Sequence, residues 1–234
     1  MPYLLLVLTT LFWSGNFVLS RGMHTDIPPL ALSFWRGALA LLIMVAFSSR
    51  VFRSQSDIIL RERKFLIIQG LLGVTGFNSL IYLALQTTTA VNAVLINSCT
   101  PILIALCSLL INKEPLNFRQ SMGIFLSLSG VTLIMVGGDL SSLVELKFNR
   151  GDLLVLCAGL IWALYSVNLK SYPKDLHPFA YQIGIMITGL IGILPLYLVE
   201  LGMGYQMSVN TPILMTIVYV AIFPSVLAFI FWNR

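Results

Sequence analysis

Eight apolar runs dominate the sequence, and each is about long enough for a helix to cross a bilayer once. Hydrophobic residues make up 58% of the chain and charged residues only 10%, a balance outside the range of soluble proteins. Because lipid cannot satisfy backbone polar groups, such runs cross the bilayer as helices. The sequence therefore predicts an all-α polytopic membrane protein, with spans at Tyr3–Ser20, Pro29–Phe47, Lys64–Leu85, Ala90–Ile111, Phe118–Val136, Gly151–Leu169, Pro178–Val199 and Pro212–Trp232.

The basic residues predict the orientation of these spans, because cytoplasmic loops of membrane proteins are enriched in Lys and Arg. With the N-terminus inside, ten of the 14 basic residues lie in cytoplasmic loops, three lie in outer loops and Arg36 lies within a span. We therefore expect a multi-pass protein of the cell's inner (plasma) membrane with a cytoplasmic N-terminus. The net charge of +5 is this topology signal, so the lipid bilayer is an expected partner and nucleic acid is not.

An internal repeat relates two parts of the chain at an offset of 149 residues. Trp13 aligns with Trp162 and Pro29 with Pro178, so the sixth and seventh spans repeat the first and second. A chance match between apolar runs is the alternative. Because five spans is an odd number, the second copy would enter the membrane upside down, as in the inverted repeats of secondary transporters. We expect a ten-span carrier fold with eight spans present and C-terminally incomplete: a five-helix repeat over 1–137, an outer linker over 138–150 and a partial, three-helix repeat over 151–234.

Polar and aromatic side chains inside the spans fall on shared helix faces, which predicts a substrate cavity between the repeats. Helical spacing places Trp13 with Asn16 on the first span and Trp162 with Tyr165 on the sixth. The alternative is that these groups only hold the helices together, at about 0.6 kcal/mol per hydrogen bond. The candidate substrate-binding residues are Trp13, Asn16, Arg36, Asn78, Tyr82, Asn97, Pro101, Trp162 and Tyr165.

Pro101 predicts a kink near the centre of the fourth span. It has no N–H to donate to the carbonyl of Asn97, and its ring crowds that carbonyl. A carbonyl freed in hydrocarbon needs a polar partner, which favours a place beside a protein-lined cavity. The alternative is a local repair in which Ser98 or Thr100 bonds back to the backbone.

Two charged residues need separate explanations. Arg36 is the only ionisable residue well inside a span, which makes it a candidate for contact with substrate or for gating. The alternative is that it snorkels outward or holds helix ends together. Glu114 lies in the turn before Pro115, where we expect a structural role, with its carboxylate capping the N-terminus of the fifth span.

The sequence carries no signature of an enzyme, a cofactor site or a metal site. There is no GxxxxGK[ST] loop for ATP, no acidic residue in mid-span and no Ser/His/Asp set. Cys99, Cys107 and Cys157 lie in apolar runs without metal-binding or disulfide spacing. We therefore expect no enzymatic activity, no cofactor and no bound metal.

The motifs together resemble the EamA-type members of the drug/metabolite transporter superfamily. The resemblance covers nearly the whole chain and rests on Leu11–Val18, Phe34–Arg36, Tyr82–Leu85, Thr100–Ile102 and Glu114–Leu116. It implies an inner-membrane carrier that exports or exchanges small metabolites, such as amino acids or drug-like solutes, by alternating access. The positions that it carries over are Trp13, Asn16, Arg36, Pro101 and Glu114. A rival hypothesis is a non-transporting membrane scaffold or assembly partner, or an inactive truncated carrier.

Overall fold

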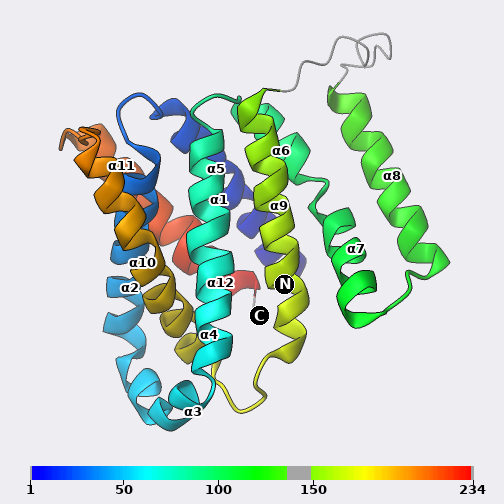
Figure 1. Ribbon diagram of the computed structural model, residues 1–234, viewed down its shortest axis with the longest axis horizontal. Coiled ribbons are helices and arrows are strands. Elements are labelled where there is room, and N and C mark those ends of the chain that lie inside the picture. Colours follow the sequence, from blue (N-terminus) through cyan, green and yellow to red (C-terminus); the bar gives the residue numbers. More distant parts are fainter. Residues whose placement is uncertain (1, 136–148, 233–234) are drawn as a thin grey trace.

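The computed structural model describes residues 2–135 and 149–232, which are helical and contain no strand (Figure 1). The elements are α1 (Pro2–Gly22), α2 (Pro29–Ser54), α3 (Ser56–Arg61), α4 (Arg63–Gln69), η1 (Gly70–Gly76), α5 (Phe77–Ala84), α6 (Ala90–Asn97), α7 (Thr100–Asn112), α8 (Phe118–Met135), α9 (Arg150–Asn168), η3 (Leu169–Ser171), α10 (Pro178–Gly202), α11 (Thr211–Val220), η4 (Ala221–Leu227) and α12 (Ala228–Trp232).

Seven stretches of the described residues are long and apolar enough to cross a membrane. They are Tyr3–Gly22, Pro29–Ser54, Arg63–Ala84, Ala90–Asn112, Arg150–Ser171, Pro178–Gly202 and Thr211–Phe231. The predicted all-α, multi-pass architecture is therefore confirmed for the part of the chain that the structure describes.

The fifth expected span is not among these seven. It forms α8, whose described part ends at Met135, so the last expected residue lies outside the described residues. α8 stands at the edge of the bundle, beyond α6 and α7 (Figure 1), and most of its side chains are exposed. The predicted linker over 138–150 also lies outside the described residues, apart from Asn149, which caps α9, and Arg150.

The fourth span is broken where Pro101 predicts a kink. α6 ends at Asn97, α7 begins at Thr100, and Pro101 lies in the first turn of α7. Ser98 Oγ donates to the carbonyl oxygen of Val94 at 2.8 Å, but that oxygen already accepts the backbone N–H of Ser98 at 3.0 Å. The kink is confirmed, and the bond from Ser98 does not reach the Asn97 carbonyl that Pro101 leaves without a donor.

Helix α2 continues past its expected end at Phe47 and runs to Ser54. The apolar run stops at Phe47, but the buried face of the helix does not. Ser48 is 6% exposed, and Phe52 packs on the cluster formed around Leu66. Tertiary packing therefore sets the end of this helix, rather than its hydropathy.

Two of the membrane-spanning stretches, Arg63–Ala84 and Thr211–Phe231, each contain a π-helical segment, which the sequence patterns do not predict. η1 joins α4 to α5, and η4 joins α11 to α12 at an offset of 151 residues. The backbone N–H of Phe77 reaches back to Leu72, and that of Ala228 to Phe223, in the i to i−5 pattern of a π-helix. Such segments occur frequently at functional sites.

The helices before residue 136 and those after residue 148 pack against one another in two similar sets of contacts. α10 packs against α4 and η1, while α2 packs against α11 and η4. α9 packs against η1 and α5, while α1 packs against η4 and α12. α2 and α10 pack directly against each other. The first set places α10 and α9 against the stretch from α4 to α5, and the second places α2 and α1 against the stretch from α11 to α12.

Glycines bring α10 and η1 into backbone contact. A Cβ added at Gly70 would lie 2.7 Å from the carbonyl oxygen of Ile185, and one added at Gly189 would lie 2.4 Å from Cβ of Val74. Larger residues would separate the two elements, because small side chains are what allow helix backbones to approach closely in membranes.

Candidate functional site

A series of hydrogen bonds joins α1, α2 and α5 inside the bundle. Arg36 Nη1 donates to the Tyr82 hydroxyl at 2.8 Å, and this hydroxyl donates to Asn16 Oδ1 at 2.9 Å. Ser20 Oγ donates to the same oxygen at 3.4 Å. Tyr82 is 2% exposed and Asn16 is 8% exposed, while Arg36 is half-buried. Three predicted site residues therefore meet in one place, which we call the Arg36–Tyr82–Asn16 chain.

Arg36 points into the bundle rather than toward the membrane surface. Its guanidinium carbon lies 5.5 Å from the ring centroid of Tyr82, within the range of a cation–π contact. Among the described residues no carboxylate pairs with it, because the ion pairs found there are formed by Arg61 and Lys170. A partly buried charge without a counter-ion loses hydration that nothing of opposite charge replaces.

Trp162 and Tyr165 share a face of α9, as their spacing predicts, and form an aromatic cluster with α5 and α10. The Trp162 ring centroid lies 4.9 Å from that of Tyr165 and 4.7 Å from that of Phe77. The Tyr181 hydroxyl donates to the Tyr165 hydroxyl at 3.0 Å. A Cβ added at Gly73 would lie 2.7 Å from the Tyr165 ring, so the cluster lies against η1.

Trp13 lies against the other π-helical segment. Its indole Nε1 donates to the carbonyl oxygen of Pro224 in η4 at 3.3 Å. The neighbouring Phe12 meets Phe223 edge-on, with centroids 5.1 Å apart. Trp13 on α1 thus lies beside η4, and Trp162 on α9 lies beside Phe77 of α5.

The remaining candidates bond locally. Asn78 Nδ2 donates to the carbonyl oxygens of Gly73 at 2.9 Å and Val74 at 3.1 Å, where the π-helical segment returns to an α-helix. Asn97 Oδ1 accepts from Thr100 Oγ1 at 3.3 Å, and Pro101 is exposed. In the described part of the protein, none of these bonds reaches the Arg36–Tyr82–Asn16 chain.

Glu114 makes structural contacts in the turn after α7, but capping of the fifth span is not among them. Its carboxylate accepts from Ser108 Oγ at 3.0 Å and from Lys170 Nζ, which ties the turn after α7 to the end of α9. The Lys170 hydrogen bond, with that of Ser108, holds the pKa of Glu114 below its ordinary value. Asn117 and Gln120 cap α8 instead, by reciprocal bonds of 2.8 and 2.9 Å between side chains and backbone.

The sequence patterns do not identify Glu200, although it is only 7% exposed. Its carboxylate accepts the backbone N–H groups of Leu30 at 3.0 Å and Ala31 at 2.7 Å. It therefore caps α2, whose own N-cap residue, Pro28, offers no side-chain acceptor. A helix that starts without a capping residue, together with an acid at the end of an apolar run, was the available signal.

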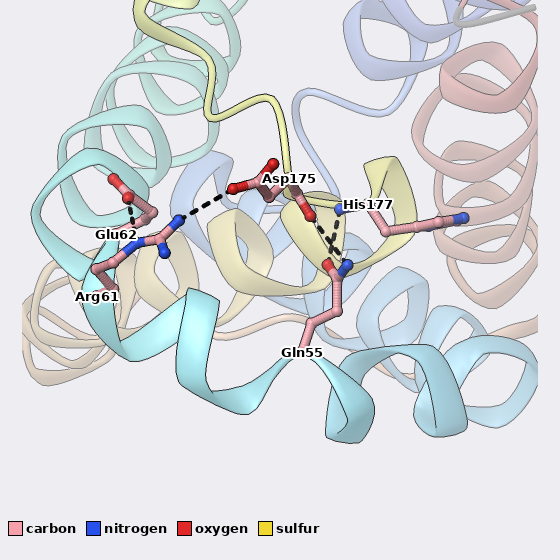
Figure 2. A network of polar contacts seen from close by, with 5 residues as sticks. All are labelled: Gln55, Arg61, Glu62, Asp175 and His177. Atoms are coloured by element: carbon pink, nitrogen blue, oxygen red, sulfur yellow. Dashed lines mark hydrogen bonds and ion pairs between the residues drawn. The ribbon is translucent and has the colours of Figure 1, made fainter.

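Gln55 joins the other end of α2 to the start of α10. Its Oε1 accepts the backbone N–H of His177 at 2.7 Å, and its Nε2 donates to the carbonyl oxygen of Asp175 at 3.1 Å (Figure 2). Arg61 extends this network by pairing with Glu62 at 2.9 Å and with Asp175 at 3.6 Å. α2 and α10 are therefore antiparallel helices that are pinned to each other at both ends.

This arrangement can now be compared with known proteins. The model of the EamA-like transporter family matches residues 1–136 and 149–234. The chain belongs to this family. The resemblance read from its motifs is confirmed, and the EamA-family chain is a multi-pass membrane transporter and not an enzyme.

Several relatives of this EamA-family chain cover most of its length. YyaM, an uncharacterized transporter of Bacillus subtilis, is 30% identical over an alignment of 238 positions that covers 99% of this chain and 76% of the relative. An uncharacterized transporter of Archaeoglobus fulgidus is 31% identical over an alignment of 237 positions, with coverage of 98% and 78%. The threonine/homoserine exporter RhtA of Escherichia coli is 25% identical over 191 residues, with coverage of 82% and 60%. One solved crystal structure has the same fold, with a TM-score of 0.70, 19% identity and coverage of 99% and 77%.

Proposed function

We propose that this chain is a carrier that exports or exchanges small metabolites across the cell's inner membrane by alternating access. The observation that carries the proposal is the Arg36–Tyr82–Asn16 chain, in which three helices bring a charge, a phenol and an amide together inside an apolar bundle. Burying such groups costs free energy unless they are paired, and a site for a polar solute gives them a use. Membership of a transporter family supports this interpretation.

Alternating access requires two halves that move against each other around a site, and we propose that they are two inverted repeats. The exchanged packing of α2 with α10, and of α1 with α9, supports a two-fold relation between them. The π-helical segments at an offset of 151 residues support the same relation. The first repeat lies over 1–137 and the partial second repeat over 151–234.

The binding region would lie where these halves meet. The Arg36–Tyr82–Asn16 chain supplies polar contacts from the first half. The aromatic cluster of Trp162 and Tyr165 supplies a stacking surface from the second half, beside η1. Asn78, Asn97 and Pro101 then belong to the helix irregularities that surround this region rather than to its polar centre.

The contacts that join α2 to α10 at their two ends, made by Glu200 at one end and by Gln55 and Arg61 at the other, would control access from the two sides of the membrane. With the N-terminus in the cytoplasm, Gln55 and Arg61 lie at the inner end of this helix pair and Glu200 lies at its outer end. A carrier that alternates must loosen one end while it keeps the other closed. Both sets of contacts join the first half to the second, as such a function requires.

Efflux measurements test the proposed function. Cells that express the full-length gene are loaded with amino acids, beginning with threonine and homoserine because RhtA is an exporter of these two, and the panel is then extended to drug-like solutes. Tyr82→Phe removes the hydroxyl that joins Arg36 to Asn16, and we expect it to reduce efflux at least tenfold. Tyr197→Phe is the matched control, because its hydroxyl only accepts an exposed bond from Trp35.

Equal efflux by the two tyrosine variants would show that the buried hydroxyl takes no part in transport. Correct membrane insertion with no efflux of any solute in the panel would favour the rival hypothesis of a non-transporting scaffold or an inactive carrier. The two results are separated by measuring the amount of inserted protein in the same membranes.

A further inference from the structure

Arg36 brings a positive charge into the bundle that nothing described in the protein balances. Its one described hydrogen bond goes to a neutral phenol, and its cation–π partner is the ring of the same Tyr82. The acid on the adjacent helix α10, Glu200, uses both carboxylate oxygens on the backbone of Leu30 and Ala31. Since a partly buried cation is stabilised by an opposite charge, the missing partner is an anion.

The groups around Arg36 are also arranged to donate rather than to accept. The Tyr82 oxygen accepts from Arg36, and Asn16 Oδ1 accepts from the hydroxyls of Tyr82 and Ser20. The acceptors of the chain are therefore occupied by its own members. A guanidinium has five N–H donors and an amide has two, and within the described residues only one donor of Arg36 is used by the chain.

The hydrogen-bonding groups that the Arg36–Tyr82–Asn16 chain leaves unused are donors, and its one charge is positive. Such a cluster fits an anionic group. A guanidinium matches a carboxylate by two parallel N–H···O bonds, and each carries one unit of charge. A phosphate monoester, at about −1.5 to −2, would bring more negative charge than Arg36 balances. Arg36 is half-buried, so part of its side chain remains accessible.

We infer that Arg36 is the binding group for a carboxylate on the transported solute, with Asn16 and Tyr82 positioning it. Tyr82 fixes the guanidinium through its hydroxyl, and Asn16 fixes Tyr82. This inference rests on the proposed function, because it names the chemical class of the solute that the same site accepts. It predicts selection for monocarboxylates over the carboxamides of the same shape, in which an uncharged amide replaces the carboxylate.

The experiment uses the purified full chain in detergent and in proteoliposomes. The probes are threonine and phenylalanine, the carboxamide of each, and inorganic phosphate. Binding is measured by ligand-induced thermal stabilisation, and transport by counterflow. We expect each acid to bind at least tenfold more tightly than its amide, and phosphate to bind more weakly than either acid.

Variants at position 36 decide whether this preference comes from Arg36. Arg36→Gln should bind acid and amide equally, while Arg36→Lys should keep part of the preference because it keeps the charge. Trp35→Phe is the control on the same helix, since its side chain is 43% exposed and bonds to Tyr197. If neither Arg36 variant folds, the comparison of acid with amide in the unmodified chain still decides.

The outcomes separate the two proposals. Transport that treats acids and amides alike, an undiminished preference in Arg36→Gln, or preferred binding of phosphate would each overturn the carboxylate assignment and leave the carrier function standing. Failure of every probe, together with failure of every solute in the efflux panel, would overturn the proposed function and this assignment with it.

Discussion

Removal of the Glu200 carboxylate should destabilise the whole helix pair, because it caps α2 from the far end of α10. The carboxylate accepts two backbone N–H groups at 3.0 and 2.7 Å, and it lies at the positive end of the α2 dipole. A hydrogen bond to a charged group contributes about 1.5–3 kcal/mol, and a charge at a helix N-terminus contributes about 0.3–1 kcal/mol. Glu200→Gln keeps one acceptor and loses the charge, so we expect a loss of about 1–3 kcal/mol in the free energy of unfolding.

Glu200→Ala removes both acceptors, and we expect it to cost about 2–4 kcal/mol, more than the amide. The assay is denaturant-dependent unfolding in detergent micelles, followed by tryptophan fluorescence. The control is Glu114→Gln, which alters an ion pair whose side chains are 55% and 50% exposed and should lower the unfolding midpoint much less than Glu200→Ala does. The reasoning would be refuted if Glu200→Ala were no more harmful than the Glu114 control.

Three further predictions concern local contacts. Gly73→Ala places a Cβ 2.7 Å from an aromatic ring, so it should lower the free energy of unfolding by about 1–3 kcal/mol; Gly123→Ala, which meets open space, should not lower it, and equal losses would contradict the packing. Lys170→Met should raise the pKa of Glu114, measured by ¹³C NMR of the carboxylate, and an unchanged pKa would count against the ion pair. Because the pKa is lowered in the folded protein, the pair stabilises the fold above the ordinary carboxyl pKa, and this stabilisation is lost as pH falls through the lowered value. Gln55→Ala should speed amide hydrogen exchange at the start of α10, where the Gln55 carboxamide accepts a backbone N–H; unchanged exchange would show that this bond does not hold.

Much of the architecture follows from hydropathy alone. A run of apolar residues about as long as a bilayer is thick has few alternatives to a helix, and seven of the expected spans are found among the described residues. The break at Asn97 to Thr100 could be predicted as well, because Pro101 removes a donor that no neighbour replaces. These are local properties, and local sequence determines them.

The contacts between distant parts of the chain could not be predicted in the same way. Glu200 meets Ala31 across 169 residues of sequence, and Gln55 meets His177 across 122. No sequence pattern links the two partners of either hydrogen bond, because each bond satisfies free backbone groups at a helix end and requires no motif. The same reason explains Glu114, whose expected local cap is replaced by a bond to Lys170 on another helix. The π-helical segments η1 and η4 pack against α10 and α2, and hydropathy does not encode these contacts.

The candidate site could be predicted only in part. Helical spacing places Asn16 and Tyr82 on interior faces of two helices, the charge of Arg36 within a span marks it as a candidate, and the structure joins the three by hydrogen bonds. Asn78 follows the same spacing, yet it bonds to its own helix because the π-helical segment offers it carbonyl oxygens. Spacing therefore predicts which side chains point inward, but not which of them meet.

Access of water to Asn16 from the two sides of the membrane is the most direct test of a central transport site. Asn16→Cys is introduced into a chain whose three cysteines, Cys99, Cys107 and Cys157, are replaced by serine, and a membrane-impermeant thiol reagent is applied from each side. We expect labelling that is slowed by a transported solute, and no labelling of a core control, Ile183→Cys, whose parent side chain is 0% exposed. Absence of labelling at position 16 from both sides, with and without solute, would contradict a carrier site at the Arg36–Tyr82–Asn16 chain.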